Sequence, residues 1–234
     1  MNENIFLQEM NKLGYILNEK QLKQFNLYYQ YLVEENEKIN LTSIIEKEQV
    51  YLKHFYDSAT IIKIIDLSQE NSLCDIGTGA GFPGVVLKIL YPKLNVTLVD
   101  SLNKRIKFLN NLIDKLELKD IIAIHDRAEE YANKNREKFD VVTARAVTNL
   151  PVLMEYCIPL LKVEKYFVPM KGDISQEITS AESAFNKLYS KLIKTESFNL
   201  PIENSKRTLL LIKKNKKTET IFPRKNSEII KRPL

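Results

Sequence analysis

The chain has 234 residues, of which 44% are hydrophobic and 28% charged, and its formal net charge is +5. This length suits one α/β domain with an extension, and the composition is ordinary for a globular protein. No apolar stretch approaches the ~20 residues of a transmembrane helix, and the N-terminus lacks the basic-then-apolar order of a secretory signal. We therefore expect a cytoplasmic protein with no membrane partner.

The two cysteines, Cys74 and Cys157, lie in apolar surroundings and outside any C-x-x-C pair. This spacing argues against a disulfide framework and against a zinc site. We expect both to be buried as small apolar residues, and we expect no metal.

The positive charge is concentrated at the C-terminal end. Residues 205–234 contain ten Lys and Arg and only two Glu, a net charge of +8, whereas residues 1–204 carry a net charge of −3. A basic tail favours a polyanionic partner such as RNA, because neutralising phosphates releases counterions. The alternative is a tail that only keeps the protein in solution.

Residues 1–66 are expected to form a helical extension. A helix is predicted from Asn18, a good N-cap residue, because apolar side chains then recur at helical spacing. A second helix is predicted from Glu46 to about Ile65, after a polar break around Asn40.

From Leu73 onward, short apolar runs alternate with amphipathic stretches. The runs predict five strands, at residues 73–77, 96–100, 121–125, 139–144 and 166–170. The helical stretches lie near 84–91, 103–118, 127–137, 149–161 and 175–192. This alternation is typical of an α/β fold with a doubly wound, right-handed parallel sheet.

Two further strands, at 198–202 and 208–214, predict an antiparallel end of the sheet with a turn between them. We therefore divide the chain into a helical extension at 1–66, a sheet domain at 67–214 and an irregular basic tail at 215–234.

The loop after the first predicted strand, DIGTGAGFPG, contains four of the chain's six glycines. It satisfies the dinucleotide fingerprint G-x-G-x-x-G from Gly79 to Gly84, and Asp100 lies where a ribose-binding acid is expected. A phosphate-binding P-loop is excluded, because no Lys-Ser or Lys-Thr follows Gly84.

Asp75 distinguishes between the remaining ligands. We expect its carboxylate to point into the mouth of the loop formed by Gly77 and Gly79. A pyrophosphate there would meet a like charge at a cost of about a few kcal/mol, whereas S-adenosylmethionine brings a sulfonium and an ammonium. The loop therefore favours S-adenosylmethionine over a nicotinamide dinucleotide, and a purely structural glycine turn is the alternative.

Polar residues also follow the other predicted strands. Asp100 is expected to accept hydrogen bonds from the ribose hydroxyls or, alternatively, to cap the helix near Asn103. Ala128 and Glu129, after the third strand, would edge an adenine pocket. Arg145, at the end of the fourth strand, is expected to hold the methionine carboxylate or an RNA phosphate.

Several motifs together resemble those of the glucose-inhibited division protein B family, also described as ribosomal RNA small subunit methyltransferase G: NLTSI, HFYDSA, DIGTGAGFPG, LVDSLNKRIKFL, DRAEE, FDVVTARAV and FPRK. The resemblance covers nearly the whole chain. It implies a Rossmann-like, class I S-adenosylmethionine-dependent methyltransferase fold with an N-terminal helical extension. It also implies methyl transfer to N7 of one guanine in the decoding region of bacterial 16S rRNA. By motif, the implied cofactor contacts are Gly77, Phe82, Ala128, Glu129 and Arg145.

The residues expected to bind the RNA have alternative roles. His54 and Asp57 fall on one face of the second predicted helix, where they either bind the guanine or close the helical extension onto the sheet. Lys171, after the fifth strand, is expected to meet a phosphate, with contact to solvent as the alternative. Asn40 either lines the guanine pocket or bonds the backbone locally.

N7 of guanine has a lone pair and no proton, so its methylation needs no general base. Orientation in a dry site can supply ~7–11 kcal/mol, and we therefore name no catalytic residue. Arg224 and Lys225, in the basic tail, are expected to contact phosphates. The expected partner is 16S rRNA or the small ribosomal subunit, without DNA, and the protein is expected to be a monomer. The alternative function is an inactive ribosome-associated RNA-binding factor with the same fold.

Overall fold

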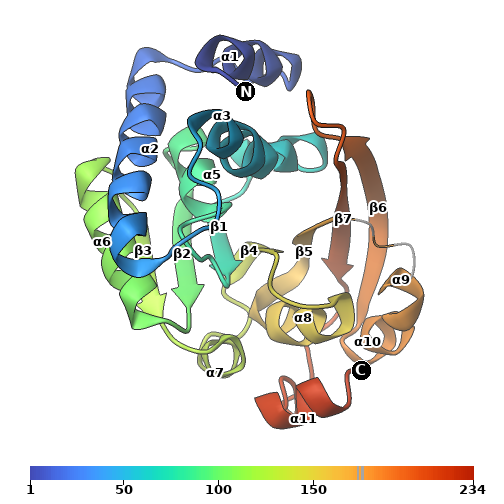
Figure 1. Cartoon of the computed structure of the whole chain (residues 1–234). Helices are drawn as coiled ribbons and strands as arrows, with labels where there is room; N and C mark the ends of the chain where they lie inside the picture. Colours follow the sequence, from blue (N-terminus) through green and yellow to red (C-terminus); the bar gives the residue numbers. More distant parts are fainter. Residues whose placement is uncertain (173, 175–176) are drawn as a thin grey trace.

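A computed structural model of the chain describes residues 1–172, 174 and 177–234. Within these residues a seven-stranded sheet has the order β3-β2-β1-β4-β5-β7-β6 (Figure 1). Strands β1 to β5 are parallel, and β7 runs antiparallel to both of its neighbours. The strands are β1 (Ser72–Ile76), β2 (Asn95–Asp100), β3 (Ile121–His125), β4 (Phe139–Arg145), β5 (Leu161–Lys171), β6 (Ser190–Asn199) and β7 (Lys206–Lys214).

The five parallel strands and the antiparallel end confirm the architecture predicted from the alternating pattern. Since β1 is paired with β2 on one side and with β4 on the other, the direction of winding reverses between β1 and β4. Ligands of doubly wound sheets bind at the carboxyl ends of the strands that flank this reversal. The loops after β1 and β4 are therefore the first place to look for a site.

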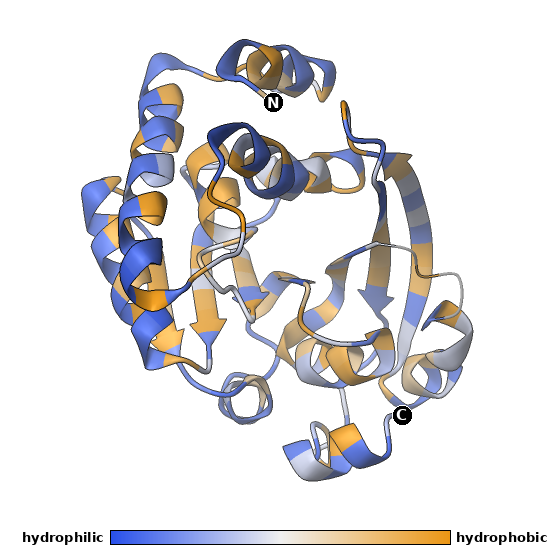
Figure 2. Cartoon of the chain, viewed as in Figure 1, coloured by the Kyte–Doolittle hydropathy of each residue, from blue (hydrophilic) through white to orange (hydrophobic). Residues whose placement is uncertain are grey.

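Helices cover both faces of the sheet and enclose two hydrophobic cores. In β1, Leu73 belongs to the core beneath α5 and α6, whereas Cys74 belongs to the core beneath α7 and α8. Figure 2 shows hydrophobic segments along the strands and along the helices that cover them. The helices that follow the parallel strands are α5 (Gly84–Leu90), α6 (Asn103–Lys115), α7 (Ala128–Lys134) and α8 (Leu150–Cys157), with the 3-10 turn η4 (Ile158–Leu160) after α8.

Both cysteines are buried and free, which confirms the prediction for them. Burial raises the pKa of each thiol well above its ordinary value. Across the described ranges, no group of His, Cys, Asp and Glu side chains could hold a metal ion. None of the helices in those ranges is long and apolar enough to cross a bilayer.

The N-terminal residues form the expected helical extension over one face of the sheet (Figure 1). Its longest helix begins with a capping box, in which Asn18 and Gln21 each accept a hydrogen bond from the other's backbone N–H. The helices are α1 (Glu3–Lys12), α2 (Glu19–Ile39), α3 (Lys47–Val50), η1 (Tyr51–Tyr56), α4 (Asp57–Ala59), η2 (Thr60–Lys63) and η3 (Leu67–Gln69). The second predicted helix is thus present, but its central turn, η1, is a π-helix.

The sequence prediction is wrong around β6. Residues 190–192, expected to end a helix, begin this strand, and the strand expected at 198–202 instead ends at Asn199. β6 lies at the edge of the sheet and carries mostly exposed polar side chains, so it lacks the apolar run by which a buried strand is recognised. The helices before it are α9 (Glu177–Ser180) and α10 (Glu182–Lys187), and residues 175–176 of the predicted helix lie outside the described residues.

The basic tail, expected to be irregular, contains the helix α11 (Asn226–Lys231) and packs against the sheet domain. Phe222, Ile229 and Leu234 are buried in the same core as α8. Arg136, from the loop before β4, donates hydrogen bonds to the backbone carbonyls of Thr218, Glu219 and Phe222. These contacts fix the path of the tail next to α8 (Figure 1).

Candidate active site

A cavity of about 400 Å³ lies at the carboxyl ends of β1, β2 and β3, and we call it the glycine-loop cavity. Its volume is within the range of about 300–1,000 Å³ that is usual for small-molecule sites. Four residues of its lining, Gly77, Asp100, Ala128 and Glu129, are ones that the sequence predicted as cofactor contacts.

Gly77 forms a wall of this cavity with bare backbone. Its φ is +68°, and a Cβ atom added there would lie 2.6 Å from Cγ2 of Val147. Its N–H donates to the carbonyl of Val99 at 2.9 Å, so the turn is fixed to the end of β2. Only glycine meets both demands, because other residues rarely adopt this φ and would collide with Val147.

Asp100 connects the glycine loop to the start of α6. Its Oδ2 accepts from the N–H of Gly79 at 2.9 Å, and its Oδ1 accepts from the N–H of Leu102 at 2.9 Å. Arg105 forms an ion pair with Oδ2 at 3.1 Å. Asp100 thus bonds the backbone just before α6, close to the capping role predicted as its alternative, and it also lines the cavity. Gly79 does not line the cavity. Ribose binding by Asp100 stays a prediction.

Ala128 and Glu129 begin α7 and line the cavity where the adenine edge was expected. Glu129 is buried, and its Oε1 accepts from Nε of Arg127 at 2.8 Å. This ion pair holds the loop after β3 against the cavity.

Asp75 does not reach the mouth of the loop, and that expectation is wrong. Because side chains alternate along a strand, Asp75 shares the face of Leu73 and lies beneath α5 rather than in either cavity of the site. Its Oδ2 accepts from Oγ1 of Thr78 at 2.7 Å and from the N–H of Gly84 at 2.8 Å. Its Oδ1 has no hydrogen-bond partner within the described part of the chain. Burial raises the pKa of Asp75 to about 6.

Phe82 belongs to an aromatic stack that joins the glycine loop to the helical extension. Its ring lies 5.3 Å from that of Tyr28 and 4.4 Å from that of His54, nearly parallel to both. The side chain is 6% exposed and lines neither cavity. A cofactor contact by Phe82 stays a prediction.

A second cavity, of about 340 Å³, lies between the helical extension and strands β4, β5 and β7. We call it the arginine cavity, because Arg145 and Arg207 line it together with His54 and Asp57. Ala146 lines both cavities, so they meet just after β4.

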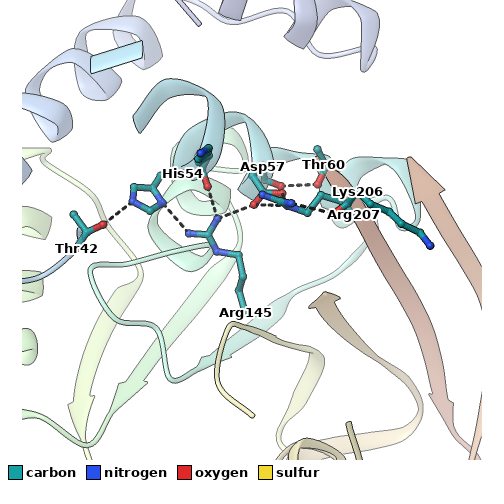
Figure 3. Close-up of polar contacts among 8 residues, drawn as sticks. Thr42, His54, Asp57, Thr60, Arg145, Lys206 and Arg207 are labelled. Carbon is teal, nitrogen blue, oxygen red and sulfur yellow. Dashed lines mark hydrogen bonds and ion pairs between the residues drawn. The ribbon is translucent and has the colours of Figure 1, made fainter. Parts of the chain in front are cut away.

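Arg145 joins the sheet to the helical extension, as Figure 3 shows. Its Nη1 donates to the carbonyl of Lys53 at 2.7 Å and to Oδ2 of Asp57 at 3.1 Å. Its Nη2 donates to Nδ1 of His54 at 3.2 Å. The guanidinium thus lines the arginine cavity rather than the glycine-loop cavity, and most of its donors are already used.

The hydrogen bonds of His54 define its protonation state. Since arginine has no acceptor, Nδ1 of His54 accepts from Arg145, and Nε2–H then donates to Oγ1 of Thr42 at 2.9 Å. Burial and the nearby Arg145 charge lower the pKa of His54 to about 3. The imidazole is therefore neutral at physiological pH, and both of its nitrogens are occupied.

Asp57 lies between two arginines. In addition to Arg145, Nε of Arg207 donates to both carboxylate oxygens at 3.1 Å (Figure 3). His54 and Asp57 thus lie together as expected and close the helical extension onto the sheet, which was the alternative role for them. In the sequence, Arg207 counts only among the basic residues of 205–234, because its partner Asp57 is 150 positions away in the chain.

Lys171 and Asn40 differ in how they relate to the site. Lys171 lines the arginine cavity, and its Nζ donates to the carbonyl of Thr148 at 2.5 Å and pairs with Oε2 of Glu177 at 2.8 Å. Asn40 lines neither cavity, and it ends α2 in the left-handed conformation with φ of 48°. Its backbone N–H donates to the carbonyl of Asn36 at 3.1 Å, and its side chain has no hydrogen bond within the described residues, so both roles predicted for Asn40 stay predictions.

Arg224 is not a free cation. Its Nε and Nη2 donate to the two oxygens of the fully buried Glu155 at 2.8 and 2.6 Å. A bidentate pair of this kind fixes the tail to α8, so the expected phosphate contact by Arg224 conflicts with its position. Lys225, the next residue, is exposed at the N-cap of α11.

Sequence similarity relates this chain to one family of methyltransferases. The sequence profile described as rRNA small subunit methyltransferase G matches residues 21–210. A ribosomal RNA small subunit methyltransferase G from Halalkalibacterium halodurans is 50% identical over 232 residues, which is 98% of each chain. The protein of that name from Bacillus cytotoxicus is 49% identical and covers 100% of this chain and 99% of the relative.

The fold is also that of solved methyltransferases. A structure described as a SAM dependent methyltransferase from Aquifex aeolicus has a TM-score of 0.54 at 13% identity, covering 77% of this chain and 97% of the other. This similarity confirms the predicted methyltransferase fold. With about half of the positions identical over nearly the full length of its relatives, the chain belongs to the rRNA small subunit methyltransferase G family.

Proposed function

We propose that the protein transfers a methyl group from S-adenosylmethionine to N7 of a guanine in the decoding region of 16S rRNA. The observation that carries this proposal is the meeting of two cavities at Ala146, at the carboxyl end of the sheet. Ala146 has a φ of +56°, a conformation that costs a non-glycine residue about 1–3 kcal/mol. Ala146 is the residue with positive φ, among the non-glycine residues described, that lines both cavities, so this conformation lies where a donor and an acceptor would come together.

The glycine-loop cavity fits S-adenosylmethionine, which supplies an electrophilic methyl group on its sulfonium. Three carboxylates, Asp100, Asp126 and Glu129, line the cavity together with the guanidiniums of Arg105 and Arg127. The wall thus keeps an excess of negative charge, which suits a cationic ligand better than a pyrophosphate. The bare backbone of Gly77 lets Val147 pack against the loop at the cavity wall. In this proposal Asp100 is near the ribose, and Ala128 with Glu129 is near the adenine.

The arginine cavity fits a nucleotide. Met170 and Leu209 give it apolar surface for a purine ring. Lys53 and Lys171 also line it, and they would contact phosphates in exchange for their carboxylate partners, Glu203 and Glu177. Its arginines and Asp57 are bound to each other, so they form a fixed rim. We propose that the target guanine enters this cavity and that its N7 is oriented toward Ala146.

The residues of the arginine cavity also fit a reaction without a general base. Both nitrogens of His54 are occupied, and both carboxylate oxygens of Asp57 accept from arginine. Since N7 has a lone pair and no proton, the protein needs only to hold the base in line with the methyl group and to exclude water. The fixed network around Arg145 supplies this orientation.

The exposed part of the basic tail is proposed to contact RNA phosphates. Lys214 is fully buried and Arg224 is paired with Glu155, so these two cations are not available for this role. Lys216, Lys217 and Lys225 are exposed. A substrate in the ribosome would place the protein in the cytoplasm, where we propose that it acts as a monomer on 16S rRNA or the small subunit.

Methyl transfer can be tested with 16S rRNA and with small-subunit particles from a strain that lacks the modification. The purified protein and methyl-labelled S-adenosylmethionine should yield labelled N7-methylguanine in 16S rRNA, identified by mass spectrometry of the nucleosides. Label in another base, in another RNA or in protein would contradict the substrate assignment. Binding of S-adenosylmethionine without transfer to any RNA would favour the inactive RNA-binding factor.

A further inference from the structure

We propose that the C-terminal helix α11 is part of the cofactor site and contacts the adenine of S-adenosylmethionine. This inference rests on the proposed function, because it concerns the ligand of the glycine-loop cavity. Two residues of α11, Asn226 and Ile230, line that cavity. They lie about a hundred positions or more after Asp100 and Ala128, which were predicted from the sequence to line it. The tail would then serve the cofactor as well as the RNA.

Contacts just before α11 and within it fix the position of this helix. Before it, Arg224 pairs with the buried Glu155, and within it Ile229 is fully buried against α8. Oδ1 of Asn226 accepts a hydrogen bond from the hydroxyl of Tyr156, which also lines the cavity. The helix therefore presents the same two side chains to the cavity without having to order on ligand binding.

The exposed surface of Ile230 points to the chemistry of the ligand. This side chain is 54% exposed although it lines a cavity, so its apolar surface has no cover within the described residues. Burying such surface is favourable at roughly 25 cal/mol per Å². A ligand with a flat apolar face would cover the exposed surface of Ile230.

Of the parts of S-adenosylmethionine, only the purine has such a face, since the methionine arm carries an ammonium and a carboxylate. Asn226 adds a polar contact. Its Oδ1 is used by Tyr156, whereas its Nδ2 donates no hydrogen bond within the described part of the chain and is available to a ring nitrogen. In this proposal Ile230 packs on the face of the adenine, and Asn226 donates to its edge.

The test compares two isoleucine-to-alanine substitutions in the tail. Ile230→Ala removes apolar surface at the cavity, and the control Ile221→Ala makes the same change at a residue that is 62% exposed and lines neither cavity. Neither side chain is in a core, so both variants should fold. Calorimetry would measure binding of S-adenosylhomocysteine and of 5′-methylthioadenosine, which has the adenosine but no amino-acid arm.

We expect Ile230→Ala to weaken the binding of both ligands by the same factor, about fivefold, and Ile221→Ala to change neither. Unchanged binding of both ligands by Ile230→Ala would overturn the inference and leave the proposed function intact. Weaker binding of S-adenosylhomocysteine alone would overturn the placement of the adenine. If the unmodified protein bound neither ligand, the proposed function and this inference would both be wrong.

Discussion

The two cavities that meet at Ala146 are assembled in different ways. Most of the glycine-loop cavity consists of residues at the carboxyl ends of β1, β2, β3 and β4 or just after them, so neighbouring strand ends bring them together. The arginine cavity joins segments that are far apart in the chain. Arg145 bonds to Lys53 across 92 positions, and Arg207 bonds to Asp57 across 150.

Because they are built differently, we expect the two cavities to have different roles. The first cavity is defined by backbone conformation, as at Gly77, and we expect it to determine cofactor affinity. The second is defined by a charge network between the helical extension and the sheet, and we expect it to determine how the target base is oriented. Substitutions should therefore affect binding and methyl transfer separately.

The largest effect is expected for Arg145→Ala. Without this guanidinium, Lys53, His54 and Asp57 lose the group that holds them to β4. Methyl transfer should fall by about 100-fold, because small misplacements of a reacting group have costs of this order. Affinity for S-adenosylmethionine, measured by calorimetry, should change less than about threefold, since Arg145 does not line that cavity.

Removing one partner of a buried ion pair also costs about 3–5 kcal/mol of unfolding free energy, so the folded fraction must be measured by circular dichroism. Lys194→Ala is a control for the loss of a cation, because Lys194 is half-exposed and lines neither cavity. A parallel loss of cofactor affinity and transfer in Arg145→Ala would show that the two cavities do not act separately.

Gly77→Ala should have the next largest effect, and on binding. The added Cβ would collide with Val147 at the wall of the glycine-loop cavity, so we expect affinity for S-adenosylmethionine to fall by about 30-fold. Gly14→Ala is the matched control, because Gly14 has a similar φ of +81° but nothing lies within 4 Å of its Cβ position. Equal losses of affinity in the two variants would mean that backbone strain alone, and not the shape of the cavity, is responsible.

Asp75 predicts a pH dependence of stability. Burial raises its pKa from 3.8 to about 6, so the folded protein holds this proton more tightly than the unfolded chain does. The free energy of unfolding, measured in urea, should therefore fall as the pH rises from about 4 to about 6. Affinity for S-adenosylmethionine should not follow this titration, since Asp75 lines neither cavity.

Asp75→Asn should abolish this pH dependence. The asparagine carbonyl can still accept from Thr78 and Gly84, so the loop keeps its hydrogen bonds. A fall of the same size in Asp75→Asn would assign the pH dependence of the unfolding free energy to another group.

The smallest effects on binding are expected in the tail, where two adjacent cations should differ. Lys225 is exposed, and Lys225→Ala should lower the salt slope of RNA binding by about one. Arg224 is paired with Glu155, and Arg224→Ala should lower the unfolding free energy measured in urea. An unchanged salt slope in Lys225→Ala would leave Lys225 without an RNA contact.

The sequence predicts a part of the site well when its residues lie in short motifs, and poorly when the residues that contact each other are far apart in the chain. Gly77, Asp100, Ala128 and Glu129 were placed correctly at one cavity, because each lies at or just after the end of a recognisable strand. The orientation of Asp75 was missed, although alternation along β1 puts it on the side of Leu73. That signal was present in the sequence, but the charge of Asp75 suggested the opposite.

Other features lay beyond local patterns. The docking of the tail depends on Phe222, Ile229 and Leu234, three apolar residues spaced among many cations. The network of Arg145 and Arg207 depends on tertiary packing, which fixes contacts that no short motif specifies. Composition alone therefore assigned to RNA binding one residue, Arg224, that anchors the fold.

A crystal structure of the protein with bound S-adenosylhomocysteine would test most directly that the two cavities have separate roles. We predict that the ligand occupies the glycine-loop cavity, with its adenine against Ile230 and its sulfur next to Ala146. The arginine cavity should remain free of this ligand, with Arg145 still bound to His54 and Asp57. A ligand in the arginine cavity, or one whose sulfur lies far from Ala146, would contradict the account.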